Sequence, residues 1–213
     1  MAQRVCDGDA LTAAHAVHGA NGYLVHQFLE NHSNVRTDQW GGSAEKRSRF
    51  GLRVVEAVAA AIGETRTAIR LSPFTTFQGM KMAPGDILET YSYFVTQLKS
   101  RFPKLAYLHV IEPRISGAET VECSKADSLD FVADIWRPSP LLVAGGFKAN
   151  DASAVTSRYE NAVIVYGRYF LSTPDLVARL KHNIAFNPYN RDTFYLTDDE
   201  PRGYIDYPFA AAA

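Results

Sequence analysis

Short, continuous apolar runs alternate along this chain with longer stretches whose apolar positions repeat at helical spacing. The apolar runs cover Ala13–Val17, which is weak, and then Thr67–Leu71, Ala106–Ile111, Leu141–Ala144 and Ala162–Tyr166. Runs that are apolar at nearly every position are typical of strands that are covered on both faces. The pattern therefore predicts five buried strands of four to six residues each.

The segments between these runs predict helices. In Ala44–Ile62 a single apolar stripe consists of Gly51, Val54, Val55, Val58, Ala59 and Ile62, with Ser43 as N-cap and Gly63 as stop. Further helices are expected from a cap at Asp86 to about Phe102, over Ser128–Trp136, from Asn150 or Asp151, and over Thr173–His182. Strands that alternate with helices predict βαβ units, right-handed crossovers and a parallel sheet within one α/β domain.

Composition and charge narrow the function classes. The 213 residues carry a net charge of −1, so no electrostatic footprint for nucleic acid stands out. No apolar run approaches the roughly 18 residues of a membrane helix, and the first ten residues lack the apolar core of a secretory signal. Cys6 and Cys123 are isolated in the sequence, which indicates reduced thiols in a cytoplasmic protein.

The run His18-Gly19-Ala20-Asn21-Gly22-Tyr23 contains three candidate catalytic side chains within six residues. An imidazole and an amide three residues apart can both donate hydrogen bonds to one oxygen, and a nearby phenol can deliver a proton. Such a set can polarise a carbonyl and then protonate a neighbouring carbon. An isolated His-x-x-Asn pair more often hydrogen-bonds the backbone of a turn, and an isolated tyrosine more often packs at a helix start.

Polar residues also follow the predicted strands, whose carboxyl ends form the active face of a barrel. Arg70 ends one strand, where it needs an anion or a structural salt bridge. Gly145-Gly146 and Gly167-Arg168 follow the last two strands. Glycine allows close backbone approach to a phosphate and arginine adds charge, so the two loops together indicate a phosphate site.

The run His18–Tyr23, with Gln27–Leu29 and Asn34–Ser43 after it, resembles a signature of the Old Yellow Enzyme family of flavin-dependent ene-reductases. The resemblance extends to the tail segments Asn190–Tyr195 and Gly203–Pro208. It implies an incomplete (β/α)8 TIM barrel of about five parallel strands, with the N-terminal strands missing. Residues 1–213 would then form a single partial-barrel domain, with an unrelated lead-in at 1–12 and an irregular tail at 187–213.

The same resemblance implies roles for individual residues. His18 and Asn21 would bind the carbonyl oxygen of an enone-like activated alkene, and Tyr23 would protonate its α-carbon. Arg70 would lie at the pyrimidine end of FMN, with NADPH or NADH as electron donor. The loops Gly145–Gly146 and Gly167–Arg168 would hold the FMN phosphate, and Tyr195 would line the substrate pocket, unless it packs in the core.

Two further segments each allow two interpretations. Glu112-Pro113-Arg114 lies at the active face in the family, and it equally suits a simple charge pair. The basic run Lys46–Arg49 is most simply a solvated helix face, although the family also has arginines there.

The alternative function is that of a catalytically inactive, truncated fragment that needs a partner to fold. Five parallel strands leave two edges, so the strand at Ala13–Val17 should pair only with Thr67–Leu71, and Ala162–Tyr166 should be the other edge. The chain would then self-associate through these edges. A flavin-free phosphate-binding lyase or aldolase is disfavoured, because no Schiff-base lysine or metal cluster lies at a strand end.

Overall fold

A computed structural model describes residues 3–7, 10–80, 82–117, 119–124, 126–148, 150–196 and 200–210 of the chain, and only the backbone for 3–7 and 10–13. Residues 1, 2, 8 and 9 of the expected lead-in and residues 197–199 and 211–213 of the expected tail lie outside this description. The chain forms two compact units, of which the first comprises Met1–Gly145 with Asn161–Val163 and the second Gly146–Glu160 with Ile164–Ala213. The prediction of one domain over residues 1–213 stays a prediction.

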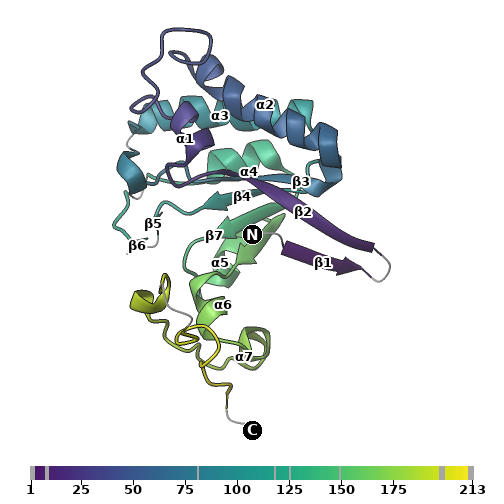
Figure 1. The fold of residues 1–213 in the computed structure, drawn as a ribbon, viewed down its shortest axis with the longest axis vertical. Coiled ribbons are helices and arrows are strands. Elements are labelled where there is room, and N and C mark those ends of the chain that lie inside the picture. The colour runs from purple at the N-terminus through teal and green to yellow at the C-terminus, as the bar shows by residue number, and fades with distance from the viewer. Residues whose placement is uncertain are drawn as a thin grey trace. The chain divides into compact units, whose positions relative to one another are not determined.

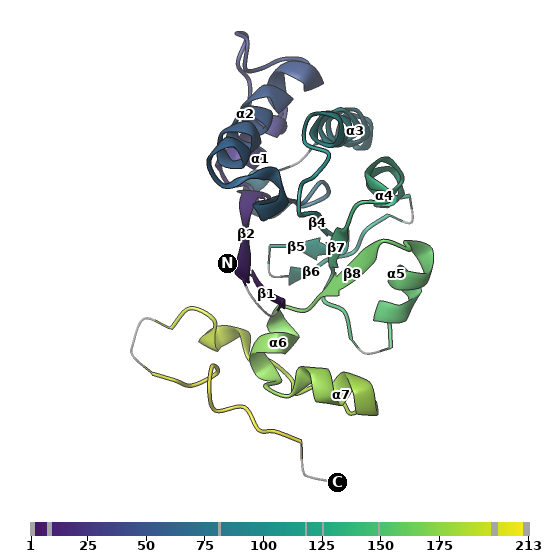
Figure 2. The same cartoon turned by 90° about the vertical axis from the view of Figure 1, so that its right-hand side faces the viewer.

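The main sheet of the described residues has six strands in the order β1-β2-β3-β4-β7-β8; Figure 1 labels all of them except β8, which Figure 2 labels. Their bounds are β1 Gln3–Asp7, β2 Ala10–Gly19, β3 Thr67–Leu71, β4 Tyr107–Ile111, β7 Leu141–Ala144 and β8 Ala162–Val165. The four strands from β2 to β7 pair in parallel, and β8 follows β7 at the end of the order. All five predicted strands are therefore present, and together they make the incomplete α/β barrel that was expected.

Helices of the first unit cover one face of this curved sheet (Figure 2). They are α1 Leu24–Leu29, α2 Ala44–Ile62, α3 Pro84–Arg101 and α4 Asp130–Trp136. The Ser43 hydroxyl accepts a hydrogen bond from the Lys46 backbone N–H at 3.4 Å, which confirms the predicted cap of α2. Gly51 lets α2 and α3 approach closely, because a Cβ there would lie 2.9 Å from the Phe94 ring.

The remaining elements are short. The second unit holds α5 Ala152–Arg158, α6 Arg168–Ser172 and α7 Leu176–His182, with the 3₁₀ turn η3 Arg191–Thr193 in the tail. The first unit also has the 3₁₀ turns η1 Glu64–Arg66 and η2 Phe77–Gly79 and the hairpin of β5 Ile115–Ser116 with β6 Glu119–Thr120. In the described part of the chain, no helix carries an apolar stretch long enough to cross a bilayer.

The start of β2 corrects the predicted pairing of that strand. β2 begins at Ala10 rather than Ala13, and its first half pairs antiparallel with β1, so that Ala13 and Ala14 lie opposite Arg4 and Gln3. The expectation that Ala13–Val17 pairs with Thr67–Leu71 alone is wrong for these two alanines, because the preceding residues fold back as a hairpin. From His15 to Gly19 the pairing is with β3, as expected.

The helix boundaries show two further differences. Asp86 is no N-cap: α3 begins at Pro84 after Ala83, and the Asp86 carboxylate accepts a hydrogen bond from Asn31 Nδ2 at 2.8 Å. The helix expected over Thr173–His182 begins only at Leu176, and Pro174 lies in the short link after the separate helix α6. Proline lacks an N–H and fixes its own φ, which suits such a link.

Arg47 corrects the interpretation of the basic run as a solvated face. Arg47 and Ser48 are buried. The Arg47 guanidinium donates to the Leu29 carbonyl oxygen at 2.9 Å, to Thr90 Oγ1 at 2.5 Å and to the Gly42 carbonyl oxygen. This side chain therefore ties α2 to the end of α1 and to α3.

Candidate active site at the carboxyl ends of β2 and β3

The polar run that follows β2 folds as a tight turn. Asn21 and Gly22 have φ angles of 56° and 72°, and the Tyr23 N–H donates to the Ala20 carbonyl oxygen at 3.2 Å. Positive φ at both central residues is the mark of a type I′ turn, for which Asn-Gly is the preferred pair. A Cβ at Gly22 would lie 2.7 Å from Gln78 Cβ, so this backbone geometry requires glycine.

The turn brings Tyr23 back against His18. Their ring centroids lie 4.8 Å apart with an interplanar angle of 49°, and Tyr23 is 49% exposed. The side-chain oxygen of Asn21 is buried and has no hydrogen-bond partner. The structure therefore gathers the three predicted catalytic residues around the carboxyl end of β2, where a parallel α/β sheet binds ligands.

Strand register places a row of polar side chains beside this turn. His18 is the partner of Arg70 on β3, and Arg70 is the partner of His109 on β4. The adjacent positions Ile69 and Leu108 are fully buried and point to the opposite face, since side chains alternate along a strand. The row thus lies on the face that the helices leave open in the first unit. His109 was missed by the sequence reasoning, although it is the one polar residue in the run Leu108–Ile111.

The electrostatics of this row favour a single positive charge. Burial lowers the pKa of Arg70, but an arginine keeps its proton at neutral pH. Burial, followed by the charge of Arg70, lowers the pKa of His18, and the same two causes with His18 lower the pKa of His109 to about 3. Both imidazoles are therefore neutral at pH 7. Each can donate a hydrogen bond, and neither carries a positive charge that would compete with Arg70 for an anion.

Arg70 lacks an anionic partner in the part of the chain that the structure describes. Its Nε atom is buried without a hydrogen bond, and so is Nε2 of His109. The salt-bridge interpretation of Arg70 is therefore not supported among the described residues. A buried N–H that is left unpaired costs free energy, which a bound anion or polar heterocycle would recover.

The low pKa of His109 predicts a loss of stability in acid. Since the unfolded histidine titrates near pH 6.5 and the folded one near 3, protons bind first to the unfolded chain as the pH falls below 6.5. We expect unfolding free energy to fall by about 2–3 kcal/mol between pH 6.5 and about 4.5 from this one group. Urea unfolding at a series of pH values measures this loss.

His109→Leu should flatten that part of the pH profile, while His32→Leu serves as the control, because His32 is an exposed histidine of the same unit. An equally steep profile in His109→Leu would contradict the assignment of this acid sensitivity to the polar row.

The predicted phosphate loops show mixed geometry. Gly146 has a φ of 64°, and a Cβ at Gly167 would meet no atom within 4 Å, so both positions suit close backbone approach. The Arg168 guanidinium donates to the Tyr189 hydroxyl at 2.9 Å and lies 5.2 Å from the centre of that ring. Gly145 ends the main segment of the first unit, whereas Gly146, Gly167 and Arg168 belong to the second.

The structure also describes the two remaining candidates, Tyr195 and the segment Glu112-Pro113-Arg114. Tyr195, in the second unit, is 89% exposed, so the alternative of core packing is wrong for it. Arg114 Nε donates to Glu112 Oε2 at 3.1 Å, as the charge-pair interpretation of this segment expects.

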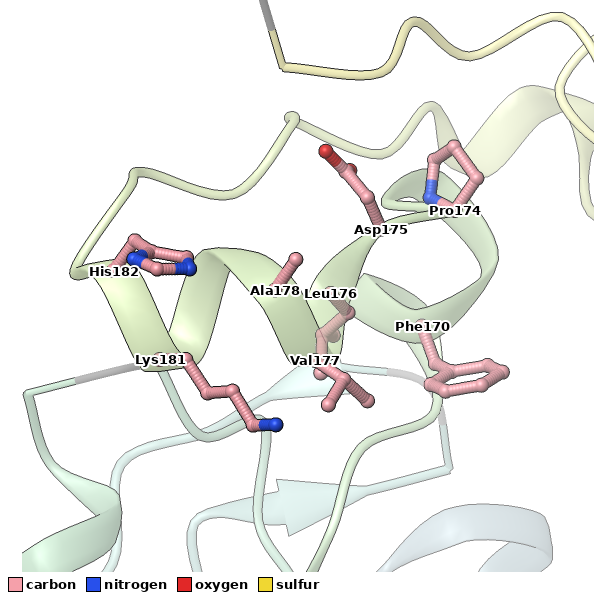
Figure 3. Close-up of a pocket in the computed structure, with 8 residues that line it drawn as sticks. All are labelled: Phe170, Pro174, Asp175, Leu176, Val177, Ala178, Lys181 and His182. Carbon is pink, nitrogen blue, oxygen red and sulfur yellow. The ribbon is translucent and has the colours of Figure 1, made fainter. Parts of the chain in front are cut away.

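A separate pocket of about 490 Å³ lies on the second unit (Figure 3). Helix α7 and the residues before it form most of its wall, and its lining includes Phe170, Asp175, Val177, Lys181 and His182. The Asp175 carboxylate accepts a hydrogen bond from Arg179 Nε at 2.7 Å. None of the predicted site residues lines this pocket, so we assign the candidate site to the ends of β2 and β3.

Comparison with known families tests the resemblance directly. The family profile described as NADH:flavin oxidoreductase / NADH oxidase matches residues 9–187. The chain belongs to this family. The resemblance to Old Yellow Enzymes is thereby confirmed.

Relatives and solved structures agree with this assignment. The chain is 44% identical over 199 residues to the chanoclavine-I aldehyde reductase fgaOx3 of Penicillium roqueforti, covering 92% of this chain and 52% of that protein. It is 40% identical over 199 residues to enoate reductase 1 of Kluyveromyces lactis, covering 90% and 50%. It is also 40% identical over 200 residues to the "probable inactive dehydrogenase easA" of Claviceps fusiformis, covering 91% and 51%.

The fold comparison gives the same picture. Old Yellow Enzyme from Pichia sp. AKU4542 superposes with a TM-score of 0.79 at 31% identity, covering 93% of this chain and 50% of that one. Morphinone reductase superposes with a TM-score of 0.76 at 35% identity, covering 91% and 50%. The chain spans about half the length of the curated relatives it matches.

Proposed function

We propose that this chain carries the substrate-activating half of an FMN-dependent oxidoreductase, which uses NADPH or NADH to reduce the C=C bond of an enone-like alkene. When bound, FMN supplies the hydride that reaches the β-carbon of the substrate. The observation that carries the proposal is the half-buried Arg70, whose Nε is buried without a hydrogen bond, beside His18 at the strand end that also holds the Asn21–Gly22 turn. A cytoplasmic location stays a prediction.

His18 and Asn21 bind the carbonyl oxygen of the substrate in this proposal. Because burial and Arg70 lower the pKa of His18, its imidazole is neutral at pH 7 and donates one hydrogen bond. The Asn21 amide group supplies the second donor. Two donors on one oxygen stabilise the negative charge that develops there as the β-carbon is reduced.

Tyr23 donates the proton to the α-carbon. Its ring lies against that of His18 and is half exposed, so the hydroxyl is free to approach a substrate held on the His18 side. A phenol is a weak acid, but it suffices for a strongly basic carbon centre. Tyr195 lines the substrate pocket in this proposal, as the family resemblance implies.

Within each unit, the residues proposed for FMN have chemistry that suits the part of the group assigned to them. The unpaired Nε of Arg70 suits the pyrimidine end of the flavin, where reduction adds negative charge. The glycines 145, 146 and 167 suit the phosphate, since Gly146 already has positive φ and Gly167 has open space beside its Cα. Arg168 would add charge there.

Titration of the purified chain with FMN, followed by flavin fluorescence, tests the proposal. We expect FMN to bind with saturable quenching of its fluorescence. Arg70→Leu should lower the affinity for FMN by roughly ten- to a hundredfold, because a hydrogen bond to a charged group contributes about 1.5–3 kcal/mol. Arg53→Gln is the matched control, since Arg53 forms an exposed ion pair with Glu56 on α2. No change in fluorescence up to millimolar FMN would overturn the enzyme assignment for this chain.

An inactive fragment is the second candidate function. One observation favours it: some of the relatives are named as probably inactive dehydrogenases or reductases. Under this alternative the chain alone does not bind FMN. It shows a cooperative thermal unfolding transition only when a partner supplies further strands. The titration and a thermal melt therefore separate the two candidates.

A further inference from the structure

The turn that carries Asn21 is held by buried side chains from other elements. The Asn21 backbone N–H donates to Ser72 Oγ at 2.8 Å, and the Gly22 N–H donates to His26 Nδ1 at 3.1 Å. His26 lies on α1 and is 0% exposed, and Ser72 follows β3 and is 1% exposed. Two buried side chains thus hold the two successive N–H groups of the turn.

The carbonyl groups of the same two residues are also held. Gln78 Nε2 donates to the Asn21 carbonyl oxygen at 2.9 Å, and Gln27 Nε2 donates to that of Gly22 at 2.7 Å. A left-handed conformation at a residue other than glycine, such as Asn21, persists where surrounding contacts over-determine it. The turn meets this condition at all four backbone N–H and C=O groups of Asn21 and Gly22.

The hydrogen bonds fix the protonation of His26. Because Nδ1 accepts the Gly22 N–H, the ring proton of the neutral imidazole lies on Nε2. This atom faces Glu30 Oε2 at 3.7 Å. Ser72 Oγ lies 3.5 Å from the same Nδ1, so the two buried groups contact each other behind the turn.

We propose that His26 and Ser72 are positioning residues, which lock the Asn21–Gly22 turn and so hold the Asn21 amide and the Tyr23 ring beside His18. The role rests on the proposed function, in which Asn21 and His18 bind one oxygen. Neither residue contacts the substrate in this assignment. A small displacement of a binding group is costly, since misplacement by about 1 Å can lower a rate about a hundredfold.

Three substitutions separate the contributions. His26→Leu removes the acceptor for Gly22, whereas His26→Asn keeps an acceptor, because an amide Oδ1 can take the place of Nδ1. Ser72→Ala removes only the acceptor for Asn21. His32→Leu, an exposed histidine beyond α1, is the control.

Amide exchange and ¹⁵N NMR on the chain itself give the first measurement. We expect His26→Leu to speed exchange of the Gly22 amide at least tenfold and Ser72→Ala to do the same for Asn21, while His26→Asn and His32→Leu leave both within about threefold. The ¹⁵N shifts of His26 should show an unprotonated Nδ1 and a protonated Nε2. Unchanged exchange in both loss variants, or the opposite tautomer, would overturn the positioning role.

Phenol binding in the presence of FMN gives the second measurement, since a phenolate oxygen mimics the substrate oxygen. We expect His26→Leu and Ser72→Ala to lower phenol affinity about tenfold or more with little change in FMN affinity, and His26→Asn to restore it. Equal phenol affinity in all variants would contradict the positioning role. If the parent chain binds neither FMN nor phenol, the proposed function fails, and the exchange experiment still decides whether the turn is locked.

Discussion

Replacing Tyr23 by phenylalanine should slow alkene reduction by roughly 10²–10⁴-fold, the usual contribution of a positioned general acid. The substitution removes one hydroxyl and leaves the ring, which packs 4.8 Å from His18. The turn and the oxygen-binding pair should therefore stay in place. The experiment uses the chain joined to the half of the Penicillium roqueforti reductase that it does not match, so that a full-length barrel is assayed.

Two half-reactions identify the role of the hydroxyl. Oxidation of NADPH or NADH by the flavin needs no proton at the alkene, so Tyr23→Phe should leave its rate within about a factor of three. Reduction of the alkene should slow by the full amount. If both half-reactions slowed equally, Tyr23 would not be the proton donor.

The oxygen-binding pair provides the complementary control. His18→Ala together with Asn21→Ala removes both donors, so we expect phenol affinity to fall by about a hundredfold, at about 1–1.5 kcal/mol for each hydrogen bond. Tyr23→Phe should leave phenol affinity nearly unchanged. This contrast separates binding of the oxygen from delivery of the proton.

Local signals explain which elements the sequence predicted well. The bounds of α2 agree at both ends, because Ser43 supplies an N-terminal acceptor and Gly63 adopts a φ of 90° that suits a helix stop. The strands Thr67–Leu71 and Leu141–Ala144 also agree, since each is a compact apolar run with polar residues or turns on both sides. These signals depend only on neighbouring residues.

The features that were missed depend on contacts between distant residues. β1 lacks an apolar run, and it is a strand because it pairs with the first half of β2. Arg47 reads as a surface residue in a basic run, but carbonyl groups at Leu29 and Gly42 and the Thr90 hydroxyl allow its burial. No local pattern reveals such partners.

The residues of the candidate site also fall into two groups, those that the local sequence identifies and those that depend on contacts between distant residues. The motif identified His18, Asn21 and Tyr23, and the Asn-Gly pair even indicates the type I′ turn that joins them. His109 and His26 were not identified, because one lies inside an apolar strand and the other on an amphipathic helix. Only strand register and the hydrogen bond to Gly22 show that they support the site.

Joining the chain to the missing half of a relative's barrel should raise its FMN affinity by roughly ten- to a hundredfold or more. Other parts of a full barrel would add two or three flavin contacts at about 1 kcal/mol each. The same addition should close the sheet. Within the described residues, His15–Gly19 pairs with β3 alone, and β8 ends the strand order with Val163 54% exposed.

Amide exchange and flavin fluorescence measure the two effects together. Along His15–Gly19 of β2 the amides that point away from β3 should gain protection when the second half is present, and so should outward amides of β8. FMN affinity should rise in the same samples, because one closure completes both the sheet and the site. The chain without the added half should self-associate through these edges in size-exclusion chromatography.

The opposite result has a clear meaning. A clean monomer with a sharp thermal melt, whose melting temperature and FMN affinity do not change on addition of the second half, would show that the six-stranded sheet is stable without further strands. The β1–β2 hairpin and the helices on the other face would then stabilise the sheet without closure. In that case the free edge along His15–Gly19 would be part of the folded protein rather than a place for further strands.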